Sequence, residues 1–78
     1  MFKVSVLDIK NASPIFKNSV SEVVLPGEDG EMAVLDFHQS FISTLDRGTI
    51  KIDGSSIRIK GGIAGMKENE LVILIEKE

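Results

Sequence analysis

The amino-acid sequence predicts an all-β fold: a flattened antiparallel β-sandwich of about 8–10 short strands with hairpin connections. Seven Val and ten Ile outnumber six Leu and three Ala, and β-branched side chains suit a pleated sheet better than a helix. Seven Gly and two Pro are scattered between short apolar runs, as turns between strands would be. A length of 78 residues allows a single domain over residues 1–78, with a thin core.

The first half of the chain contains three apolar runs separated by turn residues. Alternating apolar and polar residues from Phe2 to Ile9 predict a strand, and the Asn-Ala-Ser-Pro sequence at 11–14 ends it. A second apolar set, Val20–Leu25, leads into a polar loop at 26–31. Met32–Leu35 then predicts a further short strand.

Residues 37–45 fit two different structures. Phe41, Ile42 and Leu45 have helical spacing, but the segment is too short for more than one turn of helix. A single helical turn and a bent strand therefore both remain open for this part of the chain.

Thr49–Ile52 and Ile57–Lys60 predict a β-hairpin, because each alternates Ile with polar residues across a short turn sequence. We favour a turn with Gly54-Ser55 at its tip, since glycine at the first central position suits a type II′ turn. This register pairs Ile52 with Ile57.

A turn with Asp53-Gly54 at its tip is the alternative register of this hairpin. It avoids placing Lys51 opposite Arg58, a like-charge pair that costs at most about 1 kcal/mol. It also leaves Ile52 facing Ser55, which is why we rank it second.

The C-terminal part begins with Gly61-Gly62, where we expect a sharp bend. Ile63–Met66 predicts a short strand, and residues 67–69 a turn. Leu71–Ile75 is apolar at every position, so both faces of this strand must be covered. A central strand would explain this pattern, and so would a strand that lies under a partner.

Composition excludes several classes of function. Without Cys there are no disulfides or thiolate metal sites, and a single His rules out the usual multi-His zinc site. A net charge of −3 argues against nucleic acid as a partner. No apolar run reaches the roughly 18 residues of a membrane span, and the N-terminus does not resemble a signal peptide. We therefore expect no metal, no cofactor and no direct membrane insertion.

Catalytic signatures are also missing from the sequence. His38 is the only imidazole, and its spacing from Asp36 and Ser40 is not that of a nucleophile with its base. The acidic loop at 28–31 is typical of a solvated turn and lacks the ligand spacing of a calcium loop. We expect no catalytic residues.

Several short motifs follow one another in a recognisable order with nearly ungapped spacing. They are Phe16-Lys17-Asn18-Ser19-Val20, Leu25 to Leu35 (LPGEDGEMAVL), His38, Leu45-Asp46-Arg47-Gly48-Thr49-Ile50 and Lys60-Gly61-Gly62-Ile63. This order resembles the N-terminal β-sandwich domain of the epsilon subunit of F-type ATP synthase, and the likeness covers essentially all 78 residues.

The resemblance implies a non-catalytic part of the central stalk, or rotor, of a proton-translocating ATP synthase. Such a domain docks on the gamma subunit and on the polar loops of the c-ring, and helps couple ion-driven rotation to ATP synthesis. It implies a peripheral location at the bacterial cytoplasmic face of the inner membrane. The alternative is a stand-alone β-sandwich adaptor that binds another protein by an edge strand or by Phe37 and Phe41.

The resemblance also implies two groups of interface residues by their positions. The c-ring side would comprise Glu28, Asp29 and Glu31, and the gamma side Lys10, Phe37, His38 and Phe41. Core packing is an equally open interpretation for the two phenylalanines.

Three features depart from the family pattern. Asp36-Phe37 precedes His38 where the family often has Pro-Gly or Pro-Asn, and the tip at 53–56 is shorter than in many members. The family's C-terminal helical hairpin is absent from residues 1–78, so its inhibition of ATP hydrolysis and its binding of ATP are not carried over.

Overall fold

The computed structural model of the protein describes residues 1–37 and 39–78, which form eight β-strands and no helix. The predicted all-β class is therefore confirmed. Of the two structures left open for this part of the chain, a strand is found over Phe41–Leu45. The strands are β1 (Phe2–Asp8), β2 (Ser13–Val20), β3 (Glu22–Gly27), β4 (Gly30–Leu35), β5 (Phe41–Leu45), β6 (Gly48–Ile52), β7 (Ser55–Lys67) and β8 (Glu70–Lys77).

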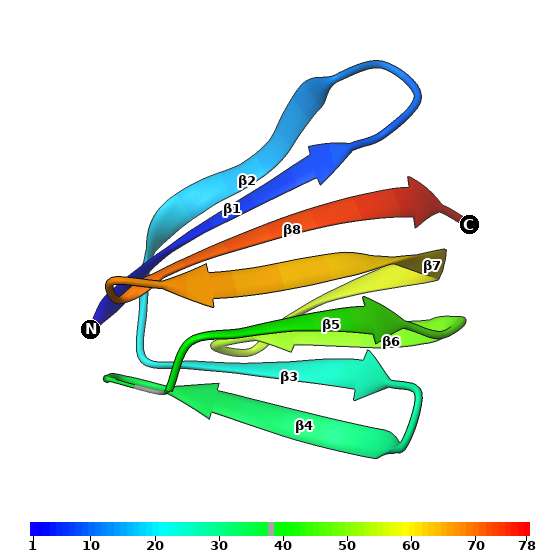
Figure 1. The fold of residues 1–78 in the computed structure, drawn as a ribbon. Coiled ribbons are helices and arrows are strands. Elements are labelled where there is room, and N and C mark those ends of the chain that lie inside the picture. Colours follow the sequence, from blue (N-terminus) through cyan, green and yellow to red (C-terminus); the bar gives the residue numbers. More distant parts are fainter. Residues whose placement is uncertain (38) are drawn as a thin grey trace.

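All eight strands belong to one hydrogen-bonded sheet, which folds over on itself into two layers (Figure 1). One layer has the order β2-β1-β8-β7-β5, and the other contains β4, β3, β6 and the first half of β7. Among the described strands, neighbours run antiparallel except β1 and β8, which are parallel. The first and last strands of the chain thus lie side by side within one layer.

The sheet passes from one layer to the other within β7. Its first half pairs with β6 and its second half with β5 and β8, and the register shifts between Ile59 and Gly61. Figure 1 shows the two halves meeting at an angle at the edge of the molecule. A Cβ on Gly62 would lie 2.3 Å from the carbonyl oxygen of Leu74, so only glycine fits there. The predicted bend at Gly61-Gly62 is confirmed, and Ile63–Met66 continues β7.

The favoured register of the β6–β7 hairpin is wrong, and the alternative is the one found. Ile52 pairs with Ser55 and Ile50 with Ile57, which leaves Asp53-Gly54 at the tip. Both tip residues have positive φ, 41° and 93°, as a type I′ turn requires. The two registers differ by two residues, so the same side chains still face the core.

Asp53 explains why this register is preferred. Its carboxylate accepts hydrogen bonds from the backbone N–H groups of Ser21 (2.9 Å), just before β3, and of Glu22 (3.0 Å), the first residue of β3. Lys51 now lies opposite Ser56 instead of Arg58, so the like-charge pair is avoided. These long-range bonds from the tip outweigh the local preference for a type II′ turn.

The sequence predicts no strand over residues 13–19, where the structure has most of β2. This segment is polar and contains Pro14, and seven of the eight strand residues are exposed or half-buried. β2 pairs only with β1, so it is an edge strand in which the missing N–H of proline is tolerated. Pro14 lies at a register shift in this pair.

Buried side chains from both layers form one core cluster. Leu71, Ile73 and Ile75 of β8 point into it with 0% exposure, while Val72 and Leu74 point outward. Of the two explanations left open for this apolar strand, the central position is found, because β8 lies between β1 and β7. Its outer face is nevertheless partly exposed to solvent.

Glu78, the residue after β8, is held by two arginines from neighbouring segments. Its oxygens accept hydrogen bonds from Arg58 (3.3 Å) and Arg47 (3.0 Å), and Arg58 also donates to the hydroxyl of Thr49. The hydrogen bond from Arg58, reinforced by Arg47, holds the pKa of the Glu78 carboxyl below its ordinary value. This cluster is exposed, so it is sensitive to salt.

The lowered pKa of Glu78 predicts a pH-dependent contribution to stability. A carboxyl whose pKa is lower in the folded state stabilises the fold above its unfolded pKa, about 4.3, and loses that contribution as the pH falls through the folded pKa. Glu78→Gln should therefore unfold at lower urea concentration than wild type at pH 7. At pH 2.5 the two curves should converge. Glu76→Gln is the matched control, and an equal difference at both pH values would contradict the assignment.

Candidate docking surfaces

The described residues carry surface features suited to binding macromolecules. Among residues 1–37 and 39–78 there is no group of His, Cys, Asp and Glu side chains that could hold a metal ion. The same part of the chain has no helix that could span a membrane. Three features stand out instead: an apolar sheet face, an acidic hairpin and an exposed phenylalanine at one end.

The first feature is the outer side of the β5-β7-β8 layer, which we call the outer apolar face. Ile42 is 82% exposed, Ile63 43%, Val72 39% and Leu74 37%. Register places them together, since Ile42 and Val72 both pair with Gly65, and Ile63 pairs with Leu74. Contiguous exposed apolar side chains on a small domain mark an interaction surface.

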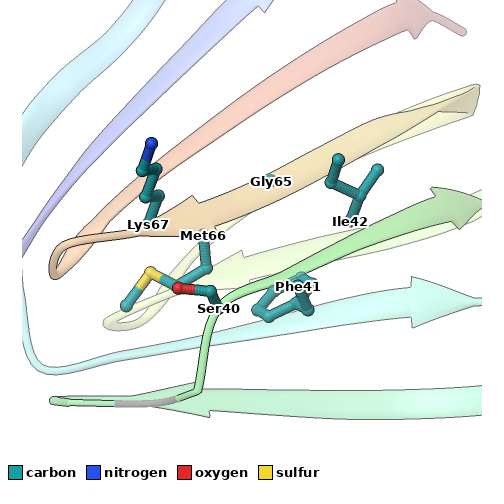
Figure 2. A pocket seen from close by; sticks show the side chains of 6 residues that line it. All are labelled: Ser40, Phe41, Ile42, Gly65, Met66 and Lys67. Carbon is teal, nitrogen blue, oxygen red and sulfur yellow. The ribbon is translucent and has the colours of Figure 1, made fainter.

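A hollow of about 630 Å³ lies where this face meets the start of β5 (Figure 2). Ile42 and Lys67 project from one side of the β5–β7 pair, and Phe41 and Met66 from the other. Gly65 contributes no side chain, which leaves room beside Ile42. The hollow is lined mainly by apolar groups and could receive a side chain of a docking protein.

The second feature is the β3–β4 hairpin, which holds the three predicted acidic residues together at its turn and at the start of β4. Glu28, Asp29 and Glu31 are all exposed, and Gly30 has φ +119°, a conformation that favours glycine. With Ile42, Ser43 and Thr44 of β5, this turn lines a second hollow of about 360 Å³. We call this the acidic hairpin.

The third feature is Phe37, which follows β4. Its side chain is 86% exposed, and its backbone has φ +59°, the left-handed region that bulky residues rarely adopt. Its N–H donates a 2.8 Å hydrogen bond to the side-chain oxygen of Asn69. A distant turn therefore holds this strained residue in place.

Asn69 is bonded to two further segments. Its side-chain N–H₂ donates to the carboxylate of Asp36 (3.1 Å) and to the backbone carbonyl of Met1 (3.3 Å). The amino group of Met1 forms an ion pair with Asp36. The bonds from this amino group and from Asn69 hold the pKa of Asp36 below its ordinary value. Three segments of the chain thus meet at one side chain.

The structure does not bring the predicted gamma-side residues into one surface. Phe41 is half-buried and packs against the core, whereas Phe37 is exposed. Lys10 follows β1, and Figure 1 shows the end of β1 at the opposite end of the molecule from the end of β4 and the start of β5. His38 lies outside the described residues.

Two features were not identified as site residues from the sequence. The outer apolar face could have been found, since Leu71–Ile75 is apolar on both faces and one face of a central strand can remain open. Asn69 could not, because its partners are 32 or more residues away in the chain.

Comparison with known proteins identifies the sequences that this chain resembles. Residues 2–77 match the family described as ATP synthase, Delta/Epsilon chain, beta-sandwich domain. The ATP synthase epsilon chain of Campylobacter curvus is 40% identical over 67 residues, covering 80% of this chain and 52% of that protein. The chloroplastic epsilon chain of Oltmannsiellopsis viridis is 35% identical, covering 81% and 52%. The chain thus spans about half the length of these relatives.

Solved structures share the fold at lower sequence identity. A chain in the cryo-EM structure of the Tetrahymena thermophila mitochondrial ATP synthase central stalk and c-ring matches with TM-score 0.82 and 13% identity, covering 96% of this chain and 63% of that one. A chain of the Euglena gracilis mitochondrial ATP synthase matches with TM-score 0.80 and 22% identity, covering 92% and 48%.

The strained backbone of Phe37 predicts that its replacement by glycine stabilises the fold. Phe37→Gly should raise the free energy of unfolding by about 1 kcal/mol, because glycine adopts positive φ without the steric cost of a Cβ. Removing the phenyl ring costs little hydrophobic stabilisation, because Phe37 is already exposed. Phe37→Ala keeps the Cβ and should show no such gain in urea unfolding. A less stable Phe37→Gly would contradict the role of strain.

Proposed function

The chain belongs to the family of ATP synthase delta and epsilon chain β-sandwich domains, and on that premise we propose that it is a non-catalytic part of the central stalk. In this role it docks on the gamma subunit and on the polar loops of the c-ring. It thereby helps couple proton-driven rotation of the ring to ATP synthesis. Its place is peripheral, at the bacterial cytoplasmic face of the inner membrane.

The outer apolar face is the observation that supports this proposal most directly. Four large apolar side chains lie together on one sheet face, and burying them removes apolar surface from water. Burial of apolar surface contributes about 25 cal/mol per Å². A stable contact with a large neighbouring subunit is the use that such a face fits, so we assign it to the gamma subunit.

The acidic hairpin suits a second, more polar contact. Glu28 and Asp29 are exposed on the turn and Glu31 on the adjoining start of β4, where they can meet basic residues on the loops of a ring. Charged contacts of this kind guide association and set orientation more than they add affinity. The hairpin tip, Glu28-Asp29, and Phe37 lie beyond opposite ends of β4, about 20 Å apart for a strand of this length. The sandwich could therefore contact two partners at once.

A rotor part also needs mechanical continuity. Every strand of the sandwich belongs to one sheet around one core, so force applied at one end is carried by packed side chains and backbone hydrogen bonds. This construction suits a part that transmits torque and performs no chemistry.

The outer apolar face predicts the effect of a charge placed at its most exposed position. Ile42→Glu should lower the affinity for purified gamma subunit at least tenfold, measured by biolayer interferometry, and leave the melting temperature within about 2 °C of wild type. Ala33→Glu, at an exposed alanine on β4 in the other layer, is the matched control. Wild-type chain that is folded but does not bind gamma would refute the stalk role and favour a stand-alone adaptor.

The acidic hairpin predicts a separate effect on the ring contact. Glu31→Lys should leave the melting temperature nearly unchanged and slow association with detergent-solubilised c-ring, most clearly at low salt. Glu68→Lys makes the same charge change in the turn between β7 and β8, at the other end of the molecule, and should have little effect. If Glu31→Lys unfolds the domain instead, Glu31 is structural and the assignment is wrong.

A further inference from the structure

Phe37 combines two properties that a mere connecting residue does not need. Its ring is 86% exposed, and its backbone is held at φ +59°. An aromatic ring in solvent gains nothing from its position in the isolated chain, while the left-handed backbone carries a steric cost. Strain of this kind is maintained where the surrounding structure fixes it, and it gathers at binding sites.

The side chain of Asn69 holds Phe37 in this backbone conformation. Its side-chain oxygen accepts the N–H of Phe37, and its N–H₂ group donates to Asp36 and to the carbonyl of Met1. Both N–H groups and the oxygen of this side-chain amide are therefore hydrogen-bonded. They join the β7–β8 turn to the N-terminus and to the residues that follow β4. Asn69 itself has φ +60°, which asparagine tolerates better than most residues. The turn positions the amide, and the amide positions Phe37.

Phe37 lies at the end of the sheet where two strands of the outer apolar face are joined by the β7–β8 turn. The turn that binds it joins β7 and β8, two of the strands that form this face, and β5 with Ile42 begins four residues after Phe37. The partner that covers the outer apolar face would therefore also reach Phe37. Exposed Met1 and Leu35 (72% and 51%) provide further apolar surface at this end.

We propose that Asn69 is a positioning residue that presents Phe37 as a preformed aromatic anchor for an apolar pocket on the gamma subunit. This inference rests on the proposed function of the outer apolar face. A preformed anchor binds more tightly than a mobile one, because the apparent dissociation constant rises as the fraction of competent conformers falls. Asn69 thus contributes to binding without touching the partner.

A double-mutant cycle tests this proposal on the full chain. The four proteins are wild type, Phe37→Ala, Asn69→Gly and the double variant, and the measured quantity is affinity for purified gamma subunit. Asn69→Gly keeps a residue that accepts positive φ and removes only the amide. Glu68→Gly is the matched control, since Glu68 lies in the same turn with φ +52°, while the N–H of Phe37 donates to Asn69.

The expected result is a tenfold or greater loss for Phe37→Ala and a threefold or greater loss for Asn69→Gly. Asn69→Gly should have no further effect once Phe37 is alanine, because it acts through that residue. Amide hydrogen exchange should show the N–H of residue 37 exchanging faster in Asn69→Gly than in Glu68→Gly. A merely structural Asn69 would weaken binding equally in both backgrounds, which would overturn the proposal.

Failure of the inference and failure of the proposed function are distinguishable. If wild type binds gamma and Phe37→Ala binds equally well, Phe37 is not an anchor. The proposed contact between the outer apolar face and gamma is then still supported. If folded wild type binds no gamma, the stalk role itself fails and the anchor falls with it. Should Asn69→Gly not fold, Asn69→Ala, which also removes the side-chain amide, takes its place and should weaken binding only where Phe37 is present.

Discussion

The two layers of the sandwich share β7, and this strand can change layers only where Gly62 lets the backbone pass the carbonyl oxygen of Leu74. A Cβ there would push β7 away from β8, the strand that supplies three buried side chains to the core. The first half of β7 brings Ile59 to that core, and the second half brings Ala64 and Met66. Gly62 therefore allows the two halves of β7 to direct their side chains into the same core.

Once the inward residues are set, the outward ones are set as well, because side chains alternate along each strand. The outer apolar face is the direct product of this alternation in β5, β7 and β8. The acidic hairpin and Phe37 lie instead in connections, where backbone conformations outside the strand region are needed and where positive φ occurs. The packed core thus keeps the outer apolar face, the acidic hairpin and Phe37 at fixed positions relative to one another. This suits a part that must join two neighbours in a rotating assembly.

Alternation in the sequence predicted the all-β class, the strand positions near Phe2, Leu25 and Leu71, and the bend at Gly61-Gly62, because these depend on local patterns. It missed β2, whose polar composition is acceptable only at an edge, and chose the wrong register for the β6–β7 hairpin, where the carboxylate of Asp53 bonds to a strand 31 residues away. The exposure of Phe37 could be suspected, but its left-handed backbone could not. The family pattern often has glycine or asparagine at that place, both of which accept positive φ readily, and here a phenylalanine occupies it.

The parallel pairing of β1 with β8 has a consequence for how the protein is made. The first strand gains its second neighbour only after residues 70–75 have been synthesised, so one layer cannot be completed until most of residues 1–78 have left the ribosome. Contacts that span nearly the whole chain are slow to form, since the entropy of closing the loop must be lost before the contact stabilises anything. Until then β1 has only β2 beside it, and the edge that will meet β8 is open to other chains. The interval before the last strand arrives is therefore the time at which this domain is most exposed to aggregation.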